Sequence, residues 1–177
     1  AIENSTGVDL IVDEEPESVS VSCFDPIRKQ IAIVAINSLI KDGRIHPARI
    51  EELVEKAKNE VMIEINKAGQ KAIFEINVKG LSKEIVDLMG RLKFRYSYGE
   101  NVLQHSIEVG RFAGILGGQI GLDVEICKTA GFLHDLGKAL SHEIEGSHAE
   151  IGADIARRNS LDEKIVTAIK EHHDRDM

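Results

Sequence analysis

Four consecutive amphipathic patterns in the C-terminal half of the chain constrain its fold more than any other feature. Apolar residues recur there at the spacing of helical turns, over residues 100–117, 123–134, 147–158 and 161–173. Each pattern carries one histidine on its apolar face, in order His105, His134, His148 and His172. Because helices with one apolar stripe bury it against one another, we predict an all-α domain in which these histidines converge.

Two of these patterns carry local signals of their own. His105 lies four, seven and eleven positions before three apolar residues, Val109, Phe112 and Leu116. We therefore expect His105 to point inward with them. Ser160, followed by Glu163, has the spacing of a capping box and predicts the start of the last helix.

The four histidines predict a metal centre when they are taken together. A single histidine on an apolar face is more often a satisfied core residue than a ligand. Four buried imidazoles, however, each need a polar partner or lose about 1–3 kcal/mol. A shared cation satisfies them all, and Asp135 and His173 directly follow two of the histidines. Imidazole and carboxylate donors suit zinc, iron, manganese or magnesium, and the sequence leaves the metal open among these.

The N-terminal half predicts two strands followed by helices. Residues 8–14 and 17–24 alternate apolar and polar positions, and Glu14-Glu-Pro-Glu17 between them predicts the turn of a hairpin. Asp25 and Pro26 predict the start of a helix that ends at Gly43. A second helix is expected from Pro47 to Gly69. A short helix over residues 83–88 is expected within a hinge region at 80–99. The predicted fold class is α+β and mostly α-helical.

Net charge limits how the chain could bind nucleic acid. It has 22 basic and 30 acidic residues, a net charge of −8, which argues against binding by general electrostatic attraction. Any RNA contact must therefore be local. A candidate segment alternates cations with rings that can stack on bases. Its candidate RNA-binding residues are Arg91, Lys93, Arg95, Tyr96 and Tyr98. The alternative is a packed connector with solvated cations.

The histidine pattern resembles the HD superfamily of metal-dependent phosphohydrolases. In that family a histidine is followed by a His-Asp pair and by a distant aspartate, with extra histidines in members that hold two metals. His105, His134 and Asp135 match the core ligands, and the resemblance makes His148 and His172 or His173 the additional ones. The family's final aspartate has no counterpart, since Asp174 and Asp176 follow too closely. Either the chain ends before the helix that supplies this aspartate or the site is incomplete. His46 and His142 do not fit the pattern.

Three stretches resemble the ribonuclease Y family: Asp25 to Arg28 with Asp42 to Arg49, Gly90 to His105, and His134 to Lys138 followed by Glu145 to His148. The resemblance covers nearly the whole chain. It implies that residues 1–44 are the C-terminal part of a KH-like RNA-binding domain and that 45–98 are a helical connector. Residues 99–177 would be the N-terminal part of an HD phosphohydrolase domain. The glycine-rich loop of the KH domain is expected upstream of Ala1. Without this loop and the final aspartate of the HD pattern, an inactive fragment is expected.

The same resemblance implies an endoribonuclease that cuts single-stranded RNA internally and initiates mRNA decay. Metal-activated water would hydrolyse the phosphodiester bond. His134, Asp135 and Lys138 are the expected catalytic residues, with Asp135 bridging or orienting the ions and Lys138 contacting a phosphate. The resemblance also implies a homodimer in the full-length protein, partners in an RNA-degrading complex, and an N-terminal anchor that places the protein on the cytoplasmic face of the bacterial membrane.

Two other functions are compatible with the residues. An HD-type phosphohydrolase acting on nucleotides or cyclic dinucleotides would use the same metal ligands. A non-catalytic scaffold that binds RNA or protein would use the histidines only for structure. The KH-like hairpin and helix in front of the histidines favour RNA as the substrate.

Overall fold

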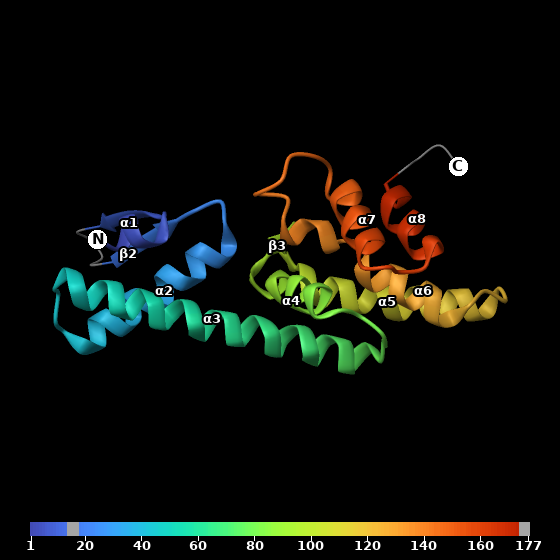
Figure 1. Cartoon of the computed structure of the whole chain (residues 1–177), viewed down its shortest axis with the longest axis horizontal. Helices are drawn as coiled ribbons and strands as arrows, with labels where there is room; N and C mark the ends of the chain where they lie inside the picture. Colours follow the sequence, from blue (N-terminus) through green and yellow to red (C-terminus); the bar gives the residue numbers. More distant parts are fainter. Residues whose placement is uncertain (14–17, 174–177) are drawn as a thin grey trace. The chain divides into compact units, whose positions relative to one another are not determined.

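The computed structural model describes residues 1–13 and 18–173 and shows a mostly helical α+β fold (Figure 1), which confirms the predicted fold class. The chain divides into two compact units, Ala1–Glu64 and Ile65–Met177. The boundary between them falls inside helix α3 (Pro47–Ile76). The predicted boundaries of the KH-like, connector and HD-type segments stay predictions.

The first unit begins with helix α1 (Ile2–Thr6), which the sequence patterns missed, and continues with the predicted hairpin. Strands β1 (Asp9–Asp13) and β2 (Ser18–Ser22) are antiparallel, with Leu10 opposite Val21. The predicted turn, residues 14–17, lies outside the described residues. Leu10 packs against the core of this unit, whereas Val12 near the end of its strand is exposed.

Helix α2 (Pro26–Asp42) has the ends that the sequence predicts. The Asp25 side chain accepts hydrogen bonds from the backbone N–H groups of Ile27 and Arg28, and Gly43 ends the helix in the left-handed conformation. A small core lies where α1 and α2 pack with the first turns of α3, made by Ile2, Ala35, Ile50, Val54 and Ala57.

Helix α3 runs to Ile76, so the predicted end at Gly69 was wrong. Gly69 instead lies where helix α4 (Lys83–Arg91) crosses α3. A Cβ atom at Gly69 would lie 2.1 Å from the carbonyl oxygen of Val86, and one at Gly90 would lie 1.9 Å from that of Ile65. These two glycines allow the helix backbones to touch. In the sequence, a glycine needed for such a contact looks the same as a glycine that ends a helix.

The rest of the second unit is the predicted set of four helices with short connections. After the 3-10 turn η1 (Leu92–Phe94), strands β3 (Tyr96–Ser97) and β4 (Glu100–Asn101) form a small hairpin. Helices α5 (Val102–Gln119), α6 (Val124–Leu133), α7 (His148–Arg158) and α8 (Glu163–Glu171) follow, with the 3-10 turn η2 (Leu136–Ala139) after α6. Figure 1 shows α7 and α8 side by side above α5 and α6. Their shared core includes the fully buried Phe132, Leu133, Leu136, Ile155, Val166 and Ile169.

The predicted capping box at Ser160 and Glu163 was wrong. Helix α8 is capped by Asp162, whose side chain accepts from the N–H of Lys164, whereas Ser160 has a positive φ of 57° in the preceding turn. The capping box lies instead at Ser147 and Glu150, at the start of α7.

The expected apolar stripe of α5 is also wrong. Phe112 and Leu116 are 66% and 59% exposed. Helix α5 turns a glycine-rich face to α6: a Cβ at Gly110 would lie 3.0 Å from the carbonyl oxygen of Lys128, and a Cβ at Gly131 would lie 2.8 Å from Ala113 Cβ. Residues without side chains carry little weight in an apolar pattern, so the face that packs most closely was not visible as a stripe.

Within the described residues, no helix combines the length and the apolar character that crossing a membrane requires.

Replacing Gly90 by alanine tests the crossing of α3 and α4. We expect Gly90→Ala to lower the free energy of unfolding by about 1–3 kcal/mol or more, because its Cβ meets backbone that cannot move aside. Chemical denaturation measures this change. Gly118→Ala is the matched control: it lies in α5, where the nearest atom is a Val124 methyl carbon at 3.1 Å, and should be near neutral. Equal stability of both variants would contradict the packing role of Gly90.

Candidate metal centre

The predicted ligand residues lie together in the second unit as two neighbouring clusters. One cluster is His105, His134 and Asp135, and the other is His148, His172 and His173. In each cluster, one ligand atom per residue lies within 4.8 Å of the others. The rings form a continuous chain, with centroids 5.2 Å apart between His105 and His134 and again between His134 and His172.

Helix ends place these side chains. His134 and His172 directly follow the last residues of α6 and α8, and His148 is the first residue of α7. Glycines bring the ends together: a Cβ at Gly137 would lie 1.9 Å from the carbonyl oxygen of His148 and 2.7 Å from the Gly152 nitrogen. The η2 turn therefore rests directly on the start of α7, which brings Asp135 next to His148.

Asp135 joins the two clusters and is only 2% exposed. Its Oδ2 atom lies 3.3 Å from His134 Nε2 and 4.0 Å from His105 Nε2. Its Oδ1 atom lies 3.4 Å from His148 Nε2 and 4.0 Å from His172 Nε2. Each carboxylate oxygen thus faces one of the two clusters.

Asp135 is held as a carboxylate. Burial raises its pKa, but hydrogen bonds with His134 and Lys138 outweigh this effect and hold the pKa well below its usual range. The Lys138 ammonium donates to Asp135 Oδ2 at 2.9 Å from one turn further along η2. An ionised carboxylate at this depth needs positive charge beside it, and Lys138 supplies part of that charge.

Backbone carbonyls fix the tautomers of two histidines. Nδ1 of His134 lies 2.7 Å from the Gly131 carbonyl oxygen, and Nδ1 of His172 lies 2.6 Å from that of Ile169. A carbonyl only accepts, so Nδ1 carries the proton in both rings. In the neutral rings, both Nε2 atoms then present lone pairs to the carboxylate of Asp135. Two acceptors that face each other repel unless a proton or a metal cation lies between them.

In the second cluster, the Nε2 atoms of three histidines face one another. His148 Nε2 lies 3.3 Å from His172 Nε2 and 2.9 Å from His173 Nε2. Burial lowers the pKa of His148 to about 4, and burial also lowers the pKa of His172. Neutral imidazoles in this arrangement cannot satisfy every facing lone pair with their own protons. A divalent cation satisfies them, so the donor set fits a metal.

His105 occupies the more open side of the centre. Its side chain is 38% exposed, so it is less buried than expected, but Nε2 faces Asp135. Its Nδ1 lies 3.7 Å from the Glu100 carboxylate. In metal sites, a carboxylate commonly orients a ligating histidine through the ring nitrogen that does not bind the metal. Sequence reasoning did not single out Glu100, because strand β4, which replaces the first residues of the predicted 100–117 helix, places its carboxylate beside His105.

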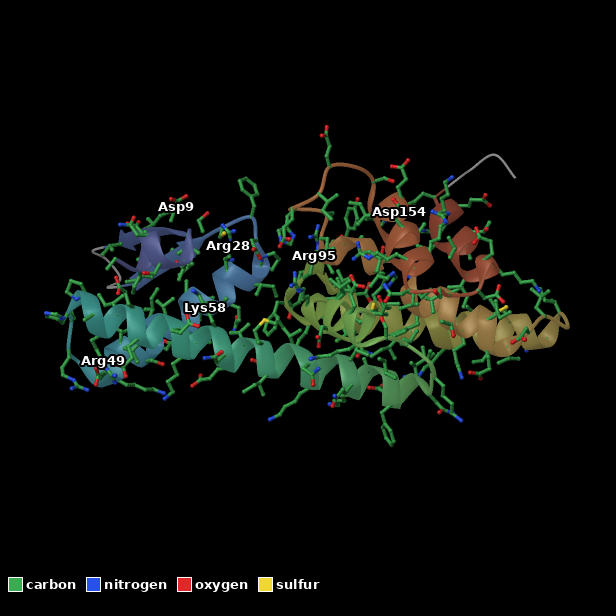
Figure 2. All side chains as sticks on the ribbon, in the orientation of Figure 1. Asp9, Arg28, Arg49, Lys58, Arg95 and Asp154 are labelled. Atoms are coloured by element: carbon green, nitrogen blue, oxygen red, sulfur yellow. The ribbon has the colours of Figure 1, made fainter. Side chains whose placement is uncertain are left out.

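The candidate RNA-binding segment lies beside this centre and is partly engaged in structural contacts. Arg95 (Figure 2) donates from Nη1 to the carbonyl oxygen of Lys138 at 2.7 Å. Arg91 lies 3.8 Å from the Glu143 carboxylate, and the Lys93 ammonium lies over the Phe94 ring. Tyr96 and Tyr98 are exposed. The Arg95 contact had no sequence signal, because its partner is a backbone atom 43 positions away.

An apolar groove of about 650 Å³ opens next to the clusters. Helices α5, α6 and α8 supply its walls, which include Val109, Ile126, Ala130 and Ala168. His134 and His172 line it at the metal centre, and Lys164 adds a cation.

Comparison with known proteins finds similarity to the HD domain family and to ribonuclease Y proteins. The HD domain family matches residues 102–177. The chain is 56% identical over 172 residues to ribonuclease Y of Acetivibrio thermocellus, a match that covers 97% of this chain and 33% of that protein. Ribonuclease Y of Thermoanaerobacter pseudethanolicus is 55% identical, and that of Clostridium tetani is 54% identical, with 97% of this chain covered in both cases and 34% and 33% of the relatives. The chain thus spans about one third of the length of these relatives. No solved structure matches it significantly.

Metal titration tests whether the two clusters form one centre. We expect calorimetry with Mn²⁺ or Zn²⁺ to show about two ions per chain, as in two-metal sites. Asp135→Asn should weaken both binding events by at least about 100-fold, because each carboxylate oxygen faces one cluster. His173→Ala should weaken only one event. His46→Ala removes an exposed histidine of the first unit and serves as the control. Unchanged affinity in Asp135→Asn would contradict a shared centre.

Proposed function

We propose that the chain is the metal-binding catalytic segment of an endoribonuclease, because 97% of it is similar to ribonuclease Y and residues 102–177 match the HD domain family. The proposed reaction is internal hydrolysis of phosphodiester bonds in single-stranded RNA, which would initiate mRNA decay. One observation carries the proposal: imidazole rings from separate helices, with Nδ1 held by backbone carbonyls, turn their Nε2 atoms toward a buried, ionised carboxylate.

A divalent metal at this centre would supply a Lewis acid that lowers the pKa of water and neutralises charge on phosphoryl oxygens. The proposed ligands are His105, His134, Asp135, His148, His172 and His173. Their nitrogen-rich donor set favours zinc or iron over magnesium and manganese, which prefer oxygen donors.

The chain's own residues would orient this chemistry. His134 and His172 keep their Nε2 lone pairs directed at the centre because backbone carbonyls hold their Nδ1 protons. Asp135 would connect the two clusters through its two oxygens. Lys138, already 2.9 Å from Asp135, is the cation best placed to contact a phosphate of the substrate.

The RNA grip would be local, as the net charge of −8 requires. Arg91, Lys93 and Arg95 would supply cations along the strand, and Tyr96 and Tyr98 would supply rings. The hairpin β1–β2 and helix α2 support the proposal of a partial KH-like module in residues 1–44. The homodimer, the RNA-degrading complex and the membrane anchor with its cytoplasmic-face location are proposals for the longer protein, which rest on the resemblance alone.

Hydrolysis of nucleotides or cyclic dinucleotides is the second candidate function. The apolar groove beside His134 and His172 favours it, since a nucleobase can bind against apolar walls. Labelled RNA, dNTPs and cyclic dinucleotides, each offered with Mn²⁺, separate the two activities. Cleavage of the small nucleotides alone would decide against the ribonuclease. A non-catalytic scaffold would bind no stoichiometric metal and cleave none of them.

Substitutions at Asp135 and Lys138 separate the metal from the phosphate contact. Asp135→Asn should lower kcat for RNA cleavage by at least about 100-fold through loss of metal. Lys138→Ala should weaken RNA binding about tenfold and lower the slope of log affinity against log salt by about 1, because one phosphate contact is lost. Cleavage of labelled RNA and binding at several salt concentrations measure these effects, with His46→Ala as the control. An unchanged salt slope in Lys138→Ala would contradict the phosphate contact.

A further inference from the structure

The hairpin beside the metal centre has an unusual turn. Tyr96 pairs with Asn101 and Ser97 with Glu100, so only Tyr98 and Gly99 connect the strands. Both have positive φ angles, of 53° and 82°. A two-residue turn of this kind favours Asn-Gly or Gly-Gly, whereas a bulky side chain such as Tyr98 is strained in the left-handed region.

Burial does not compensate for this strain. Tyr98 is fully exposed, at 106% relative accessibility, so its ring gains no core packing. Asparagine would serve the backbone better at this position. A strained, exposed aromatic residue next to a candidate active site is the kind of outlier that points to a role in binding.

The surrounding structure holds the hairpin against the metal centre. The Asn101 amide donates to the Lys93 carbonyl oxygen at 2.7 Å, and the Val102 N–H donates to the Arg95 carbonyl oxygen at 3.0 Å. Arg95 in turn binds the carbonyl oxygen of Lys138, as described above. The position of the turn is therefore tied to the loop that carries Asp135.

A small cavity of about 100 Å³ connects the turn with the ligands. Its lining includes Ser97 and Tyr98 from the hairpin and His105, Asp135 and Lys138 from the metal centre. A phosphate held at the metal centre and contacted by Lys138 would thus lie close to the turn that carries Tyr98. In single-stranded RNA each phosphate is bonded to ribose, and the nucleobase carried by that ribose is the group on which a nearby aromatic ring can stack.

We propose that Tyr98 is a stacking platform for the RNA base adjacent to the phosphate held at the metal centre. The inference rests on the proposed ribonuclease function and adds a base subsite to it. Every nucleobase has a stacking face, so the subsite would accept RNA with little sequence preference. The free energy of stacking would offset the backbone strain only when RNA is bound. The ring must be exposed in the free protein because it has to reach a base of the RNA.

Three variants test this subsite. Tyr98→Asn removes the ring and relieves the backbone, Tyr98→Phe keeps a ring, and Phe74→Ala removes an exposed ring from α3 as the matched control. Binding of a single-stranded RNA with non-hydrolysable phosphonate linkages is measured with Mn²⁺ present, so that the metal centre is occupied and no strand is cut, with 2-aminopurine as a reporter of stacking. Thermal unfolding is measured in parallel.

We expect Tyr98→Asn to bind RNA about tenfold more weakly, with the salt slope unchanged because no phosphate contact is lost. It should lose 2-aminopurine quenching and yet unfold at a higher temperature than the wild type. Tyr98→Phe and Phe74→Ala should bind within about twofold of the wild type. Equal binding and quenching in Tyr98→Asn and the wild type would overturn the subsite alone. A wild-type chain that neither binds nor cuts RNA would overturn the proposed function, and the subsite with it.

Discussion

The second unit depends on one electrostatic constraint, the burial of a carboxylate among imidazole nitrogens. Asp135 is ionised and nearly inaccessible to water, and the Nε2 atoms of four histidines lie within 4.0 Å of its oxygens. Burial of such groups is costly unless positive charge neutralises them. Lys138 supplies one such charge, and a divalent metal fits the remaining donors.

Close helix packing is what brings these groups together. Glycines on α5 and α6 let these helices approach until backbone and side-chain atoms touch, and Gly137 lets η2 rest on the start of α7. Side chains at these positions would push the helix ends apart and separate the two clusters. The glycines of this unit therefore serve the site as much as the core.

The sequence predicted the main elements because they follow from short-range patterns, and the residues that it grouped as metal ligands lie close together, although their role as ligands stays a prediction. Helical periodicity located α5 to α8, and the Pro and Gly signals located both ends of α2. The errors occurred where a long-range contact decides the role of a residue. Gly69 looked like a helix end but supports a crossing, and Phe112 looked buried but is exposed. Glu100 beside His105 and Arg95 on the Lys138 carbonyl were invisible for the same reason, since no local pattern encodes a partner elsewhere in the chain.

The arrangement of the ligands also links metal binding to folding. The six candidate ligands come from α5, the end of α6, the start of α7 and the end of α8. An unfolded chain cannot hold them within reach of one ion, so a metal that binds the folded centre stabilises the packing of all four helices. Without the metal, the facing lone pairs of His134, His148 and His172 would oppose that packing. The same charge arrangement that suits the proposed hydrolysis thus makes the stability of this unit depend on the ion that it binds.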